Sequence, residues 1–173
     1  MSSEPLAEFF ATHQRLRDCL KIARRAIEAG SIELLEATAF IGESKEQAEK
    51  WIDEARQGAE DLAIVALWAW FERYLIEYAQ ARAGAVANER PVPFTEQLSA
   101  KFGMEIERWR LDDLLDLFKP LVDVDQIGIA KQIKHYRDWV AHRNPKRLPP
   151  ALTEPRTAYS VLAAIIDAID RSK

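Results

Sequence analysis

Residues 62–76 read LAIVALWAWFERYLI and form the most apolar stretch of the chain. A helix that is apolar around most of its circumference is buried on several sides, so this stretch predicts a central helix. Glu72 is the exception within it, because a carboxylate near the core is costly unless a basic or hydrogen-bonding group meets it. We therefore expect Glu72 either to pair with an arginine or with backbone groups, or to support a functional site.

The N-terminal segment also has helical spacing. Apolar residues recur at steps of three and four from Leu6 to Ile27, which predicts a helix that ends at Gly30. His13 falls within this apolar stripe. A single histidine in such a stripe is more often a packed core residue than a ligand, and we assign it no functional role.

Two capping signals lie between this helix and the central stretch. Ser31 can cap a short second helix. Ser44, with Gln47 three residues later, is a capping-box pattern that opens the helix leading into the central stretch. Whether that helix breaks at Gly58 stays open, because an interior glycine costs only about 1 kcal/mol relative to alanine.

The second half of the chain alternates between breaks and helices. Its prolines indicate a loop over residues 88–93, after which Thr95 can cap a helix through residue 109 or 110, and a short helix over 114–118 follows. Asp125 can cap the next helix, which must end near residue 143 or 144 because a proline comes next. Thr153 can cap the last helix. Together, these helix starts and ends predict an all-α, up-and-down helical bundle of about five or six helices.

Length and composition favour one soluble domain over residues 1–173. Hydrophobic residues make up 48% of the chain and charged residues 30%, as in folded globular proteins. Cys19 is the single cysteine, so no intramolecular disulfide is possible, and no Cys/His cluster has the spacing of a zinc finger. We find no signal-peptide pattern and no membrane-length apolar run. We expect a cytoplasmic protein without a membrane span, metal or cofactor.

Basic residues gather late in the chain. Residues 131–147 contain six Lys or Arg and one Asp, a local charge of about +5 that leaves about −9 for the rest of the chain. Focused positive charge attracts polyanions even on an acidic protein. The candidate substrate-binding residues are Lys131, Lys134, Arg143 and Lys146. The alternative interpretation is a solvated helix face followed by a basic loop.

The same segment holds two of the three histidines, His135 and His142. On a helix that turns about 100° per residue, its apolar stripe (Ile129, Ile133, Tyr136 and Val140) faces the core, while Lys131, His135, Asp138 and His142 face outward. Arg137 lies between the two sides. Asp138 and His142 form an i,i+4 pair, so the carboxylate can orient the imidazole or hold its charged form.

These side chains have the chemistry that acid–base catalysis on a phosphate needs. His142 can exchange a proton near neutral pH, and Arg137 can stabilise extra negative charge on a pentacoordinate phosphate. The alternative is an ordinary ion pair on a wet surface. Arg137 and His142 are also about 140° apart on an ideal helix, so two copies of the helix across a two-fold axis would complete a site more easily than one copy.

The segment from Arg137 to His142, RDWVAH, resembles the Arg-polar-x-x-x-His signature of the HEPN superfamily. Residues 67–75, LWAWFERYL, are similar to the long apolar helix with an embedded glutamate in the ribonuclease-like branch of that superfamily. The resemblance implies an all-α bundle, often a homodimer whose paired motifs form a composite site. It also implies metal-independent RNA cleavage that leaves a 2′,3′-cyclic phosphate.

The resemblance implies a role for each matching residue. Arg137 would stabilise the transition state, His142 would act as general acid or base, and Asp138 would take the polar position of the signature. Glu72 and His135 are supporting candidates. Many members are toxins of toxin–antitoxin or phage-defence systems, so an antitoxin or other neutralising protein partner is also implied.

Two other hypotheses remain. The first is a non-catalytic helical module that binds a nucleotide or a partner protein through the same surface. The second is a purely structural partner in a larger assembly. The acidic remainder of the chain favours protein partners over long nucleic acids.

Overall fold

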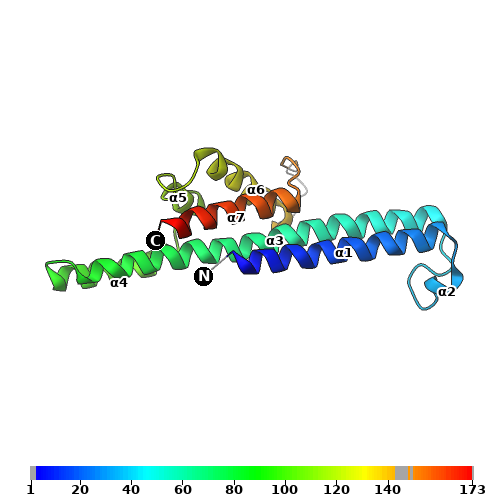
Figure 1. Cartoon of the computed structure of the whole chain (residues 1–173), viewed down its shortest axis with the longest axis horizontal. Helices are drawn as coiled ribbons and strands as arrows, with labels where there is room; N and C mark the ends of the chain where they lie inside the picture. The colour runs from blue at the N-terminus through cyan, green and yellow to red at the C-terminus, as the bar shows by residue number, and fades with distance from the viewer. Residues whose placement is uncertain (1–2, 143–147, 149, 173) are drawn as a thin grey trace.

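A computed structural model of the chain describes residues 3–142, 148 and 150–172. Within these residues the protein is all-α, with seven α-helices, one short 3-10 helix and no strand. The helices run up and down as an elongated bundle (Figure 1). In chain order they are α1 (Glu4–Glu28), α2 (Ile32–Leu35), α3 (Lys45–Ala85), η1 (Val86–Asn88), α4 (Val92–Ile106), α5 (Leu111–Asp116), α6 (Val124–His142) and α7 (Pro155–Arg171).

Helix α3 runs along the whole molecule. It spans 41 residues, which corresponds to about 60 Å at 1.5 Å per residue. The predicted cap is confirmed, because the Ser44 hydroxyl accepts a hydrogen bond from the Gln47 N–H at 3.2 Å. The helix continues through Gly58, so the apolar stretch and the segment before it form one rod.

The central part of α3 packs against α7, α6 and α5, and we call this part of the molecule the body (Figure 1). Trp68, Phe71 and Leu75 are fully buried there, which confirms the predicted central helix. From α6, Ile133, Tyr136 and Val140 are buried as the stripe predicted, while Ile129 is half-buried and packs against the same core.

Two pairs of helices extend from the body. In the α1–α3 arm (residues 14–60), α1 lies beside the first half of α3, with α2 at the tip (Figure 1). Its separate small core consists of Ile27, Ala48 and Ile52. In the α3–α4 arm (residues 79–106), α4 folds back along the end of α3. His13 is buried where the α1–α3 arm joins the body, as expected of a packed histidine.

Three predicted caps differ from the structure. Helix α4 begins at Val92, so Thr95 lies inside it, buried, and its hydroxyl donates to backbone carbonyls, at 2.7 Å in the case of Glu89. Before α6, Asp123 acts as the cap and accepts the N–H of Asp125 at 2.7 Å. Helix α7 begins at Pro155, after Glu154, one residue later than a Thr153 cap requires. Helices α4 and α7 each have a proline in the first turn, where its fixed φ suits the start of a helix.

Candidate functional site

Arg137 and Glu72 join α6 to α3. The Arg137 Nη2 lies 2.6 Å from the Glu72 Oε2. The buried Trp68, one turn before Glu72 on α3, donates its indole N–H to the same oxygen at 3.0 Å. Trp68 can reach Glu72 because residues four apart on a helix lie on the same face. Glu72 thus has the arginine partner that one interpretation of the sequence expected.

The guanidinium of Arg137 is held on three sides. Its Nη1 lies 3.0 Å from the Asp138 Oδ1, and its Cζ lies 5.6 Å from the centroid of the Trp68 ring, within cation–π range. The side chain is 22% exposed, and its Nε is buried without a hydrogen-bond partner among the described residues. Arg137 thus has one fixed orientation and keeps only a limited solvent-facing edge.

The two predicted substrate-binding lysines of α6 are paired with acids. Lys131 Nζ lies 2.6 Å from Asp116 of α5. Lys134 Nζ lies 3.2 Å from Asp138 and 3.7 Å from Asp112 of α5. Hydrogen bonds from Lys131 and from Lys119 lower the pKa of the Asp116 carboxyl below its usual value. These carboxylates offset the positive charge of α6 in the described segment.

Of the remaining predicted residues, His135 and His142 lie on α6, and Arg143 and Lys146 follow it. His135 and His142 are exposed, and His142 is the last residue of α6. Arg143 and Lys146 fall outside the described residues. The expected contact between Asp138 and His142 does not form, since the Asp138 oxygens meet Lys134 and Arg137 instead. Among the described residues, the His142 side chain forms no hydrogen bond or ion pair.

A second polar link between α3 and α6 was not anticipated. The Tyr136 hydroxyl donates to the buried Asp61 at 2.8 Å, and the Gln57 amide donates to the same carboxylate at 2.9 Å. Burial and the Asp61 charge raise the pKa of Tyr136. This network borders a hollow of about 490 Å³ that Trp139 also lines. The sequence placed Tyr136 in the core stripe, and nothing in the spacing pointed to its partner 75 residues earlier.

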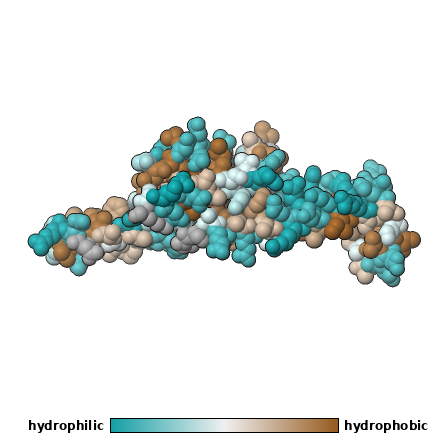
Figure 2. Space-filling view, viewed as in Figure 1, coloured by the Kyte–Doolittle hydropathy of each residue, from teal (hydrophilic) through white to brown (hydrophobic). Residues whose placement is uncertain are grey.

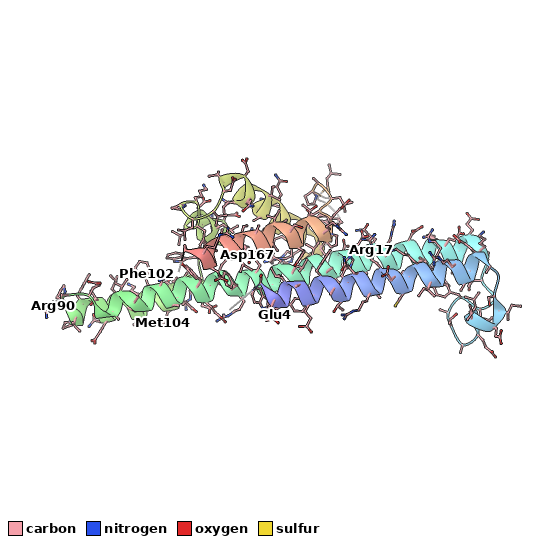
Figure 3. All side chains as sticks on the ribbon, viewed as in Figure 1. Glu4, Arg17, Arg90, Phe102, Met104 and Asp167 are labelled. Carbon is pink, nitrogen blue, oxygen red and sulfur yellow. The ribbon has the colours of Figure 1, made fainter. Side chains whose placement is uncertain are left out.

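An apolar hollow of about 400 Å³ lies where the α3–α4 arm meets α5. Its lining includes Phe102, Leu117 and Leu121, which are 42%, 54% and 43% exposed. Phe102 is labelled on α4 in Figure 3. The spacing of apolar residues did not predict this hollow, because the hollow forms only when α4 folds back along α3 and α5 packs beside it.

Comparisons with protein-family models, curated proteins and solved structures gave no match to this chain. No described helix is both long and apolar enough to cross a lipid bilayer. Across residues 3–142 and the described part after them, no group of three or more His, Cys, Asp or Glu side chains is arranged to hold a metal ion.

Proposed function

We propose that the protein is a metal-independent endoribonuclease of the HEPN type, a toxin or defence ribonuclease that acts as a homodimer on RNA in the cytoplasm. The observation that carries this proposal is the fixed Arg137. A carboxylate and an indole of α3 hold its guanidinium, and an exposed histidine ends the same helix five residues later. This is an arginine and a histidine in the order and spacing of the signature.

In the proposed reaction, His142 accepts the proton of a ribose 2′-hydroxyl, and the resulting oxygen attacks the adjacent phosphorus. The bond from phosphorus to the 5′-oxygen breaks, and a protonated group, a second imidazole or water, returns a proton to that oxygen. Arg137 stabilises the extra negative charge of the pentacoordinate phosphate. Glu72 and Asp138 act through Arg137 by fixing its orientation, and His135 is a supporting residue on the outward face.

The directions of the two side chains support the proposed dimer. Arg137 points inward to α3, whereas His142 is exposed at the helix end, in keeping with the separation of about 140° between their positions on an ideal helix. A two-fold axis near the end of α6 would bring the histidine of one copy toward the arginine of the other. The proposed site therefore uses residues from both copies.

The direct test is RNA cleavage in EDTA by the wild-type protein and by Arg137→Ala and His142→Ala variants. We expect cleavage with 2′,3′-cyclic ends, a loss of about 10²-fold or more in either variant, and unchanged cleavage by the control Arg108→Ala. Arg108 is an exposed arginine two residues after the end of α4. RNA binding without cleavage by the wild type would reject the enzyme.

A mixing experiment tests the composite site. Random pairing of Arg137→Ala and His142→Ala chains makes half of the dimers mixed, and each mixed dimer has one site with both wild-type residues. We expect about a quarter of wild-type activity to return. If each site lay within one copy, the mixture would be as inactive as its two components.

The second candidate function is a protein-interaction module, and the apolar hollow beside α4 favours it. Exposed Phe102, Leu117 and Leu121 offer a surface for apolar side chains of a partner such as an antitoxin. Phe102→Asp should abolish binding of a co-encoded neighbour protein while RNA cleavage is retained. A Phe102→Asp variant that retains both partner binding and RNA cleavage would reject this candidate function.

A further inference from the structure

Two adjoining hollows on the α1–α3 arm are lined largely by cations. One, of about 310 Å³, is lined by Arg17, Leu20, Lys21, Arg24, Ile52, Asp53 and Arg56. The other, of about 410 Å³, is lined by Gln14, Arg17, Asp18, Lys21 and Arg156. Because Arg17 and Lys21 line both, the two hollows form one continuous surface, which we call the cationic face.

The spacing on α1 produces this face. Arg17, Lys21 and Arg24 follow one another at steps of four and three residues, which places them within about 60° of one another on a helix. Arg56 joins them from α3 and Arg156 from the first turn of α7. Cations from three helices thus meet on one side of the arm.

The cationic face keeps a positive balance after its own ion pairs are counted. Lys21 pairs with Asp18 at 2.8 Å, and Arg24 and Arg56 share Asp53 at 2.6 and 3.7 Å. Arg17 and Arg156 form no ion pair with any residue in the described part of the chain. Five cations therefore face two carboxylates on a protein whose net charge is −4.

The face extends to the start of α7, where Arg156 lines it beside Arg17. Helix α6 packs beside α7, and the chain leaves α6 and enters α7 at the end of the body that adjoins the arm (Figure 1). Arg17, labelled in Figure 3, lies just beyond the start of α7. In contrast, the α6 lysines near Arg137 are already paired with α5 carboxylates, so they have less positive charge to offer a phosphate.

We propose that the cationic face binds the phosphate backbone of single-stranded RNA and directs the strand toward the end of α6. This inference rests on the proposed ribonuclease function and assigns its substrate track to residues outside the HEPN-like motif. The lining is mainly charged and contains no aromatic side chain, so the contacts would be to phosphates and independent of base sequence. A membrane surface fits less well, because the apolar residues of the lining, Leu20 and Ile52, are half-buried and buried, whereas an interfacial helix needs an exposed apolar face.

The test measures binding separately from cleavage. The probe is a fluorescent 2′-O-methyl oligoribonucleotide, which cannot be cut because its attacking hydroxyl is blocked, and anisotropy gives Kd across a salt series. Arg17→Ala/Lys21→Ala should weaken binding at least tenfold at 0.1 M salt and lower the salt slope by about 1.4, or 0.7 per lost phosphate contact. The matched control, Lys45→Ala/Lys50→Ala, removes two exposed cations of the same arm that lie outside the face and should leave Kd within twofold.

Equal effects of the two double variants, or no effect of either, would overturn the proposal. So would intact RNA binding by Arg17→Ala/Lys21→Ala with lost binding to anionic vesicles or to poly-glutamate. Circular dichroism checks folding, and Arg17→Gln/Lys21→Gln repeats the test with longer side chains. If RNA binds through this face but is never cut, the ribonuclease proposal fails alone. If RNA is cut and these variants bind normally, this inference fails alone.

Discussion

The body and the α1–α3 arm share α3 but are held together differently. In the body, α3 buries Trp68, Phe71 and Tyr74 against three other helices. In the arm, the same helix buries mainly Ala48, Ile52 and Ala59 against α1, and its surface is mostly hydrophilic (Figure 2). Large buried side chains contribute more to stability than small ones. The body therefore carries most of the stability, while the arm can devote its surface to contacts.

The largest expected effect is on the free energy of unfolding, and it comes from truncating one side chain in each of the two cores. Phe71→Ala in the body should lower the free energy of unfolding by about 3–5 kcal/mol, because it leaves a cavity among fully buried neighbours. Ile52→Ala in the arm should cost about 2 kcal/mol, since the thin arm can collapse around the change. Urea unfolding followed by circular dichroism gives both values. Equal costs would contradict the division between body and arm.

The second-largest effect on stability is expected from the ion pair between Glu72 and Arg137 within the body. Glu72→Gln removes the charge that faces Arg137 and should lower the free energy of unfolding by about 1–2 kcal/mol. Its control is Glu77→Gln, which weakens the exposed pair with Arg73 and should cost less than about 0.5 kcal/mol. Chemical denaturation measures both. A Glu72→Gln variant as stable as its control would mean that Glu72 does not stabilise the body.

A smaller effect, of opposite sign, is expected at the junction of arm and body. Gly58 is helical, and a Cβ added there would meet no atom within 4 Å. Gly58→Ala should therefore raise the free energy of unfolding by about 0.5–1 kcal/mol through helix propensity. Thermal unfolding measures the gain. A loss of stability would show that the helix needs a flexible point there.

The smallest expected effect is a pH dependence from His13, because opposing influences act on it. Burial and the Arg17 charge lower the pKa of His13, while Glu60 and a backbone hydrogen bond raise it. With the pKa below its unfolded value of 6.5, the unfolded chain binds a proton more readily, so this contribution to stability is full above pH 6.5 and is lost as pH falls toward the folded pKa. His13→Gln should flatten Tm between pH 7.5 and 5.0. An unchanged slope would contradict this assignment.

Local patterns predicted most of the helices. Periodicity identified α1, the central part of α3, and the core stripe of α6, because the spacing of apolar residues reflects which side of a helix is buried. Ser44 was predicted as a cap correctly, whereas Thr95 and Asp125 were not, because neighbouring residues competed for the same helix starts. The elongated shape was not predicted, since a periodic stripe does not specify how far its partner helix extends.

The candidate site was predicted less completely than the fold. Glu72 was expected to pair with an arginine or with backbone groups, or to support a functional site, and it pairs with Arg137. The pairing of Lys131 with Asp116 and of Lys134 with Asp112 could not be foreseen, because it depends on how α5 packs against α6. A local count of charges along the sequence therefore overstated the positive surface of α6. It also passed over the α1 cations Arg17, Lys21 and Arg24, which stand four and three residues apart in the sequence and lie on one side of the helix.

The unbroken course of α3 links the geometry of the cationic face to that of Arg137. Arg56 and Glu72 lie on the same rod with no hinge between them, so their angular phase is set by the number of residues that separate them. One extra residue after Gly58 would rotate the arm by about 100° and advance it by about 1.5 Å relative to the body. An RNA strand that contacts both the cationic face and Arg137 would no longer align with the two regions, although every contacting side chain would still be present.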